Sequence, residues 1–232
     1  NNNNNNKSPP PPCLVYSVGI RDAYSNEELM GREGCEVHAF DCTVHYETNL
    51  APNVTFHPWC LGNNASELKL DGTLGRAKDS IGQEGHEFVS FSEIVRRLGH
   101  SERELTVLKM DCEGCEWNGL LDLIQQQPTF TSRIRMLLLE MHLITTSPRV
   151  SNEQRQEELQ TIRLVSRFLA NYRTYRASLN PDASLRRFQE PSVYYKQLYP
   201  AGVHIGACCY EFAMVRKDLA HVANDTDITI VR

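Results

Sequence analysis

Residues 108–120 read LKMDCEGCEWNGL, and this stretch joins the end of one predicted element to the start of the next. The apolar run from Leu105 suits a buried strand, Asp111 follows at its carboxyl end, and Gly114 permits a turn. EWNGLLDLIQQQ then has helical spacing and stops before Pro128. A strand, a turn and a helix in this order predict one unit of an α/β fold.

The same alternation of strands and helices runs through most of the chain. Several strand candidates are apolar almost throughout, as strands covered on both faces are. We therefore expect an α/β, doubly wound, Rossmann-like and mostly parallel sheet. Two strand-like segments near the end, from Tyr172 and from Ala207, suit an antiparallel pair at the sheet edge. The other strand candidates start at Cys13, Cys35, Val54, Leu105 and Ile134, and further helix candidates cover residues 22–34, 90–100 and 151–172.

Composition sets the domain limits and excludes some partners. The opening NNNNNNKSPPPP predicts a disordered linker over residues 1–12, followed by one domain over 13–217 and a tail over 218–232. The net charge of −5 gives no basic surface for nucleic acid or an anionic membrane. No apolar run reaches the roughly 18 residues needed to cross a bilayer. We expect neither nucleic acid nor a membrane contact within this segment.

Eight cysteines are too few for a disulfide scaffold in a chain of 232 residues. Cys112 and Cys115 form C-x-x-C, but a zinc site lacks a second suitable pair, and the neighbouring acids oppose thiolate formation. Structural cysteines are the preferred interpretation, with a zinc or redox protein as the alternative.

Three triplets fit the N-glycosylation pattern, namely Asn53-Val54-Thr55, Asn64-Ala65-Ser66 and Asn224-Asp225-Thr226. The sequence has neither an initiator Met nor a signal peptide, so we expect a segment of a longer or processed chain. A secretory or membrane-anchored protein is one expectation for its location, and a cytoplasmic protein is the alternative.

Candidate ligand-binding residues follow the predicted strands. Gly19 ends the first strand, where the backbone approaches a ligand, although the usual G-x-G-x-x-G is absent because IRD follows it. Asp41 closes the second strand about twenty residues later, the spacing at which a carboxylate binds the ribose of an adenosine cofactor. Asp111 and Glu113 would face the same crevice.

Glu140 and His142 form a further candidate site in LLLEMHL. Two residues apart on a strand, they share a face near its carboxyl end. They supply a carboxylate and a group that titrates near neutrality, as general-base catalysis requires. The alternative is a buried histidine hydrogen-bonded to a neighbour.

Taken together, these motifs resemble the methyltransferase-like domains related to the FkbM family, which are class I enzymes dependent on S-adenosylmethionine. The resemblance covers residues 13–217, and D-x-E-G-x-E followed by Trp is its most specific part. It implies a seven-stranded sheet with a reversed final strand, YEFAMV, as the antiparallel edge strand. The matching motifs are SVG, AFD, FHPWCLG, LKMDCEGCEW, LLLEMHL and CCYEFAMV.

The resemblance also implies roles for particular residues. S-adenosylmethionine would lie over Gly19 and its neighbours Val18 and Ile20, its ribose held by Asp41 beside Cys42, and its methionine end near Asp111.

Methyl transfer needs donor and acceptor in line and a base for a hydroxyl acceptor. We expect O-methylation of a hydroxyl-bearing small molecule or glycan, with Glu113 or His142 as the base and Glu140 orienting the acceptor or His142. Two rival functions share the fold: an NAD-dependent dehydrogenase, against which the broken glycine pattern counts, and a catalytically silent binding module.

Overall fold

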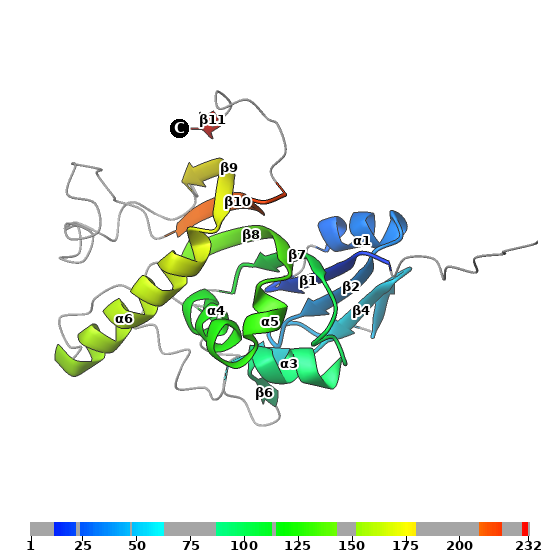
Figure 1. Cartoon of the computed structure of the whole chain (residues 1–232). Helices are drawn as coiled ribbons and strands as arrows, with labels where there is room; N and C mark the ends of the chain where they lie inside the picture. Colours follow the sequence, from blue (N-terminus) through cyan, green and yellow to red (C-terminus); the bar gives the residue numbers. More distant parts are fainter. Residues whose placement is uncertain are drawn as a thin grey trace, which may run out of the picture.

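A nine-stranded sheet runs through the computed structural model, which describes residues 12–21, 24–46, 48–62, 87–112, 115–142, 152–179, 209–219 and 229–231. Its strand order is β11-β9-β10-β8-β7-β1-β2-β4-β3 (Figure 1). The strands are β1 (Leu14–Val18), β2 (Glu36–Phe40), β3 (Asn49–Ala51), β4 (Val54–His57), β7 (Leu105–Met110), β8 (Ile134–His142), β9 (Tyr172–Leu179), β10 (Cys209–Arg216) and β11 (Thr229–Val231).

The middle of this sheet is parallel. β1 pairs with β2 and β7, β2 pairs with β4, and β7 pairs with β8, each time in parallel. Strand β10 runs antiparallel to both β8 and β9, as the expected antiparallel pair requires. The predicted α/β class with a mostly parallel Rossmann-like sheet is therefore confirmed.

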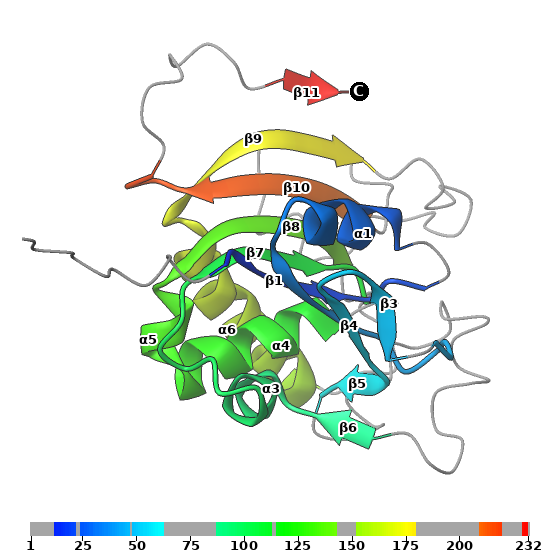
Figure 2. The ribbon, with the colours of Figure 1, turned by 90° about the vertical axis from the view of Figure 1, so that its right-hand side faces the viewer.

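Two details of the sheet differ from the expectation. The short strands β3 and β11 add one member at each edge, so the sheet has more than seven strands. The reversed strand β10 is not at the edge, because β9 precedes it in the chain and pairs along its outer side (Figure 2). The edge beyond β9 is then completed by β11, which pairs with it in parallel.

Helices cover both faces of the sheet. Val15 packs with Met30 of α1 (Ser25–Arg32), whereas the next residue, Tyr16, belongs to a larger core on the opposite face. That second face carries α3 (Phe91–Arg97), α4 (Cys115–Gln126), α5 (Pro128–Thr131) and α6 (Asn152–Leu169) (Figure 1). None of the helices in the described ranges is both long and apolar enough to span a membrane.

One predicted strand is divided in two. The run VTFHPWCLG was expected to be continuous, but β4 ends at His57 and β5 (Trp59–Leu61) begins after Pro58. Strand β5 leaves the main sheet and pairs with β6 (Glu87–Val89) in a second, two-stranded sheet. Proline has no backbone N–H to donate to a neighbouring strand, which explains the break at this residue.

Candidate functional site

The carboxyl ends of β1, β2 and β7 are joined by backbone hydrogen bonds. The N–H of Gly19 donates to the carbonyl of Phe40 (2.9 Å), and the N–H of Asp111 donates to the carbonyl of Val18 (3.0 Å). Gly19, Asp41 and Asp111 each follow a different strand, and these strands are far apart in the sequence. The three residues therefore lie together at the carboxyl ends of the parallel strands. In doubly wound folds ligands bind at this end of the strands.

Gly19 cannot be replaced by another residue without a clash. Its φ is +77°, and a Cβ atom at this position would lie 1.7 Å from the carbonyl oxygen of Asp111. Two positions later, where the missing second glycine would stand, Arg21 adopts a φ of +50°. Arg21 thus takes the left-handed conformation that glycine usually supplies, so the turn forms despite the absent glycine. Ile20, between them, is buried.

Three donors orient the buried carboxylate of Asp41. Its Oδ2 accepts from the N–H of Arg21 (2.8 Å), and its Oδ1 accepts from the N–H (2.7 Å) and hydroxyl (2.6 Å) of Thr43. An ionised carboxylate has about four acceptor positions, so a further donor can still be bound. Asp41 thereby ties the turn after β1 to the loop after β2.

Disulfides correct the expectation that the cysteines are too few for a disulfide framework. Every cysteine whose side chain the structure describes is paired, as Cys13–Cys35, Cys42–Cys60 and Cys112–Cys115. The sparse cysteines thus do form a disulfide framework, because the sheet brings residues together that are 18 or 22 positions apart. Cys112–Cys115 is a closed disulfide, which leaves no thiolate for zinc. Cys42 follows Asp41, and Cys112 follows Asp111, so two of these bonds adjoin the candidate site.

The second predicted group converges at the ends of β7 and β8. Ligand-type atoms of Asp111, Glu140 and His142 all lie within 4.8 Å of one another. His142 Nε2 is 3.8 Å from Glu140 Oε1, and both side chains lie on one face as predicted. Glu113, the other candidate base, falls outside the described residues.

Sequence reasoning missed the partner of His142. Its Nδ1 lies 2.9 Å from Oε1 of Glu116, a fully buried carboxylate on the first turn of α4. The same oxygen accepts the N–H of Cys112 (2.8 Å), and the indole of Trp117 donates to the carbonyl of His142 (2.7 Å). The helix start and the strand end are therefore held together around the imidazole.

A family of sequences described as a methyltransferase domain matches residues 4–199. The chain belongs to this methyltransferase domain family. No curated protein matches it significantly. The methyltransferase resemblance inferred from the motifs is thus confirmed at the level of the domain, and the match ends before β10.

A buried carboxylate, that of Glu27, lies beneath the turn that follows β1. Glu27 of α1 accepts a hydrogen bond from the Ser17 hydroxyl (2.6 Å), and Lys109 Nζ is 3.7 Å from the same carboxylate oxygen. Lys109 also donates to the carbonyl of Gly19 (3.5 Å). A serine and a lysine inside apolar strands were the sequence signals for this network. It places a charge pair directly beneath the turn that carries Gly19.

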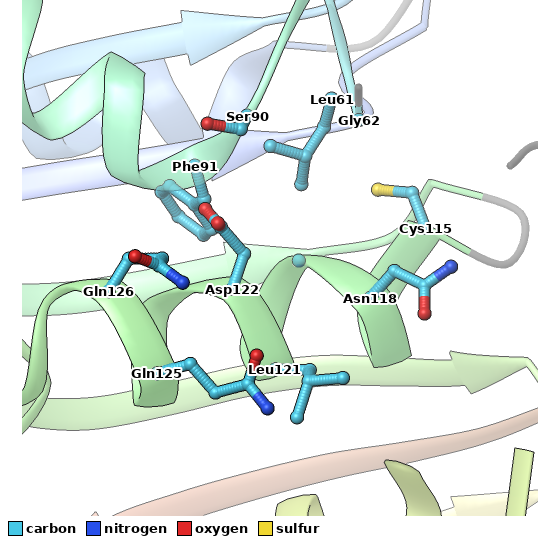
Figure 3. Close-up of a pocket in the computed structure, with 11 residues that line it drawn as sticks. Leu61, Gly62, Ser90, Phe91, Cys115, Asn118, Leu121, Asp122, Gln125 and Gln126 are labelled. Carbon is cyan, nitrogen blue, oxygen red and sulfur yellow. The ribbon is translucent and has the colours of Figure 1, made fainter. Parts of the chain in front are cut away.

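A cavity of about 320 Å³ lies beside α4 of the methyltransferase domain (Figure 3). Leu61 and Gly62, Ser90 at the start of α3, and Cys115 and Asp122 of α4 line it. Asp122 is hydrogen-bonded to the start of α3, because its Oδ2 accepts the N–H of Ser92 (2.6 Å). Among the predicted site residues that the structure describes, none lines this cavity, although Cys112, the disulfide partner of Cys115, follows Asp111.

Proposed function

We propose that this methyltransferase domain transfers a methyl group from S-adenosylmethionine to a hydroxyl oxygen of a small molecule or glycan. When bound, S-adenosylmethionine supplies a methyl group already activated on a sulfonium. The residues at the carboxyl ends of β1 and β2 fit such a cofactor: Gly19 leaves room for a close approach, and the oriented carboxylate of Asp41 can accept from a ribose hydroxyl. Asp111, next to Gly19, would meet the methionine end.

The observation that carries this proposal is the hydrogen bond between His142 and Glu116. In the proposed reactive state Glu116 is ionised and His142 is neutral, so Nδ1 donates to Glu116 and Nε2 carries the lone pair. Nε2 would take the proton of the acceptor hydroxyl as the oxygen bonds to the methyl carbon and the carbon–sulfur bond breaks. Glu116 would hold the imidazole and stabilise the imidazolium that forms.

Glu140 and Asp111 have supporting roles in this proposal. Glu140 lies on the Nε2 side of His142, where an acceptor hydroxyl would approach. It would orient that hydroxyl, while Asp111 borders the turn of Gly19 and so the donor side. The resemblance of the motifs to FkbM-related domains favours hydroxyl acceptors over other classes, and Glu113 is the alternative base.

Transfer of labelled methyl groups to a panel of glycans and hydroxylated small molecules tests the proposal. At saturating S-adenosylmethionine we expect His142→Gln to lower the rate by about 10²- to 10⁴-fold, the usual contribution of a general base. Glu116→Gln should keep the fold and lower the rate less. Equal rates for wild type, both variants and Glu113→Gln would rule out the assigned base.

A further inference from the structure

Asn53 is the one glycosylation triplet that falls within the described residues. It lies in the exposed turn between β3 and β4, at the edge of the sheet. Asn64 and Asn224 fall outside the described ranges. An acceptor asparagine has to be reachable from solvent, and the turn at Asn53 satisfies this condition.

The turn that carries Asn53 is held firmly. Asn53 has a φ of +62°, and its carbonyl accepts the N–H of Val37 (2.9 Å). Its side-chain Nδ2 donates to the carbonyl of Gly31 at the end of α1 (3.1 Å). Gly31 is packed so closely that an added Cβ would lie 2.4 Å from the Pro52 carbonyl oxygen. Nδ2 has two hydrogens, so one can be replaced while the other still donates to Gly31.

The disulfides supply an independent observation about where the chain matures. All six cysteines with described side chains are paired. Cys13–Cys35 joins the segments that precede β1 and β2, and Cys42–Cys60 joins the loop after β2 to β5. Disulfides of this structural kind form and persist in secretory and extracellular compartments and are rare in the reducing cytosol. N-glycosylation takes place in the same secretory compartments, so the bonds and the exposed triplet point to one environment.

We propose that Asn53 carries an N-linked glycan and that the chain matures in the oxidising secretory pathway. The co-reactant is a polyprenyl-pyrophosphate-linked oligosaccharide. A bond forms between Asn53 Nδ2 and the anomeric carbon of the first sugar, the bond from that carbon to the pyrophosphate oxygen breaks, polyprenyl pyrophosphate leaves, and Nδ2 loses one proton. The glycan would also shield β3, which lies at the edge of the sheet.

Peptide mapping of the protein immunopurified from its source cells tests this proposal. Digestion with trypsin and chymotrypsin separates the Asn53 peptide from the Asn64 peptide. Treatment with peptide N-glycosidase in heavy-oxygen water then converts a glycosylated asparagine to labelled aspartate. We expect the label at Asn53. Unlabelled Asn53 in correctly folded protein would overturn the glycan assignment.

Two variants at Thr55 control for folding, since both keep Asn53 and its turn. Thr55→Val retains a β-branched residue in β4 but removes the hydroxyl that the glycosylation pattern requires, so the label should disappear. Thr55→Ser retains the pattern and should retain the label.

Alkylation of the native protein without reductant tests the compartment: we expect the six paired cysteines to stay unmodified, and labelling of them would contradict the proposal.

Discussion

Gly19 is required for two separate reasons, its left-handed backbone and its contact with the Asp111 carbonyl. We predict that Gly19→Ala is much more destabilising than Gly99→Ala, because Gly99 has a similar φ of +71° but nothing within 4 Å of an added Cβ. Both variants share the cost of the left-handed conformation, about 1–2 kcal/mol. Urea unfolding measures the difference. Equal losses of stability would show that the contact with Asp111 has no energetic consequence.

At the residue scale, the sequence predicted where the candidate site residues lie better than it predicted their hydrogen-bond partners. Gly19, Asp41 and Asp111 could be placed because each directly follows an apolar strand, and parallel strands end at a common edge. The partner of His142 could not be predicted, because Glu116 is 26 residues away and only the packing of α4 on β8 joins them. In the sequence Glu116 is simply one of several acids in DCEGCE.

At the scale of elements, the Cys42–Cys60 disulfide ties the loop after Asp41 to β5. We predict that replacing both cysteines by alanine lowers the free energy of unfolding by about 3 kcal/mol, as expected for a loop of this length. It should also weaken S-adenosylmethionine binding, because the Asp41 loop loses its anchor. Thermal unfolding and calorimetric titration measure the two effects.

The matched control is the Cys13–Cys35 disulfide, which closes a loop of similar length at the opposite, amino-terminal ends of β1 and β2. Its double alanine variant should lose comparable stability and keep its cofactor affinity. An equal loss of affinity in both variants would mean that the effect of Cys42–Cys60 is global rather than local.

Element types were predictable where the apolar pattern was clear, but element pairing was not. The runs from Leu14 and Glu36 become strands that are buried along nearly their whole length, whereas the strands from Leu105 and Ile134 alternate buried with partly buried or exposed residues. Strand β5 was predicted to continue β4, but it is a separate strand because Pro58 interrupts the backbone hydrogen bonds between neighbouring strands. Disulfide pairing was missed because spacing in the sequence gives no distance in space.

At the scale of the whole molecule, a buried histidine cluster joins β1, β2, β4 and the segment after α3. His38 Nδ1 lies 2.9 Å from His57 Nε2, and His100 Nδ1 lies 2.7 Å from the Tyr16 hydroxyl. Burial first, and then the neighbouring His38, lower the pKa of both His57 and His100 to about 4. The cluster comprises Tyr16, Glu36, His38, His57, His100 and Arg103.

This cluster predicts a loss of stability in mild acid. Well above pH 6.5 these histidines are neutral in both the folded and the unfolded state, so they contribute no pH dependence there. Between pH 6.5 and about 4 the unfolded chain binds protons that the folded chain does not, and the free energy of unfolding falls as the pH is lowered. Chemical unfolding across this range should show the decline.

His57→Gln should flatten that decline, whereas His45→Gln, which removes an exposed histidine, serves as the control. A decline of the same steepness in wild type and His57→Gln would contradict the role of this group. Although the fold class could be predicted from the alternation of elements, this network could not, because its members come from segments far apart in the chain.

Calorimetric titration of the purified chain with S-adenosylmethionine is the decisive measurement for the proposed methyltransferase. We expect saturable binding of one cofactor per chain and no binding of NAD. Absence of S-adenosylmethionine binding in a folded, disulfide-bonded sample, or binding of NAD in its place, would contradict it.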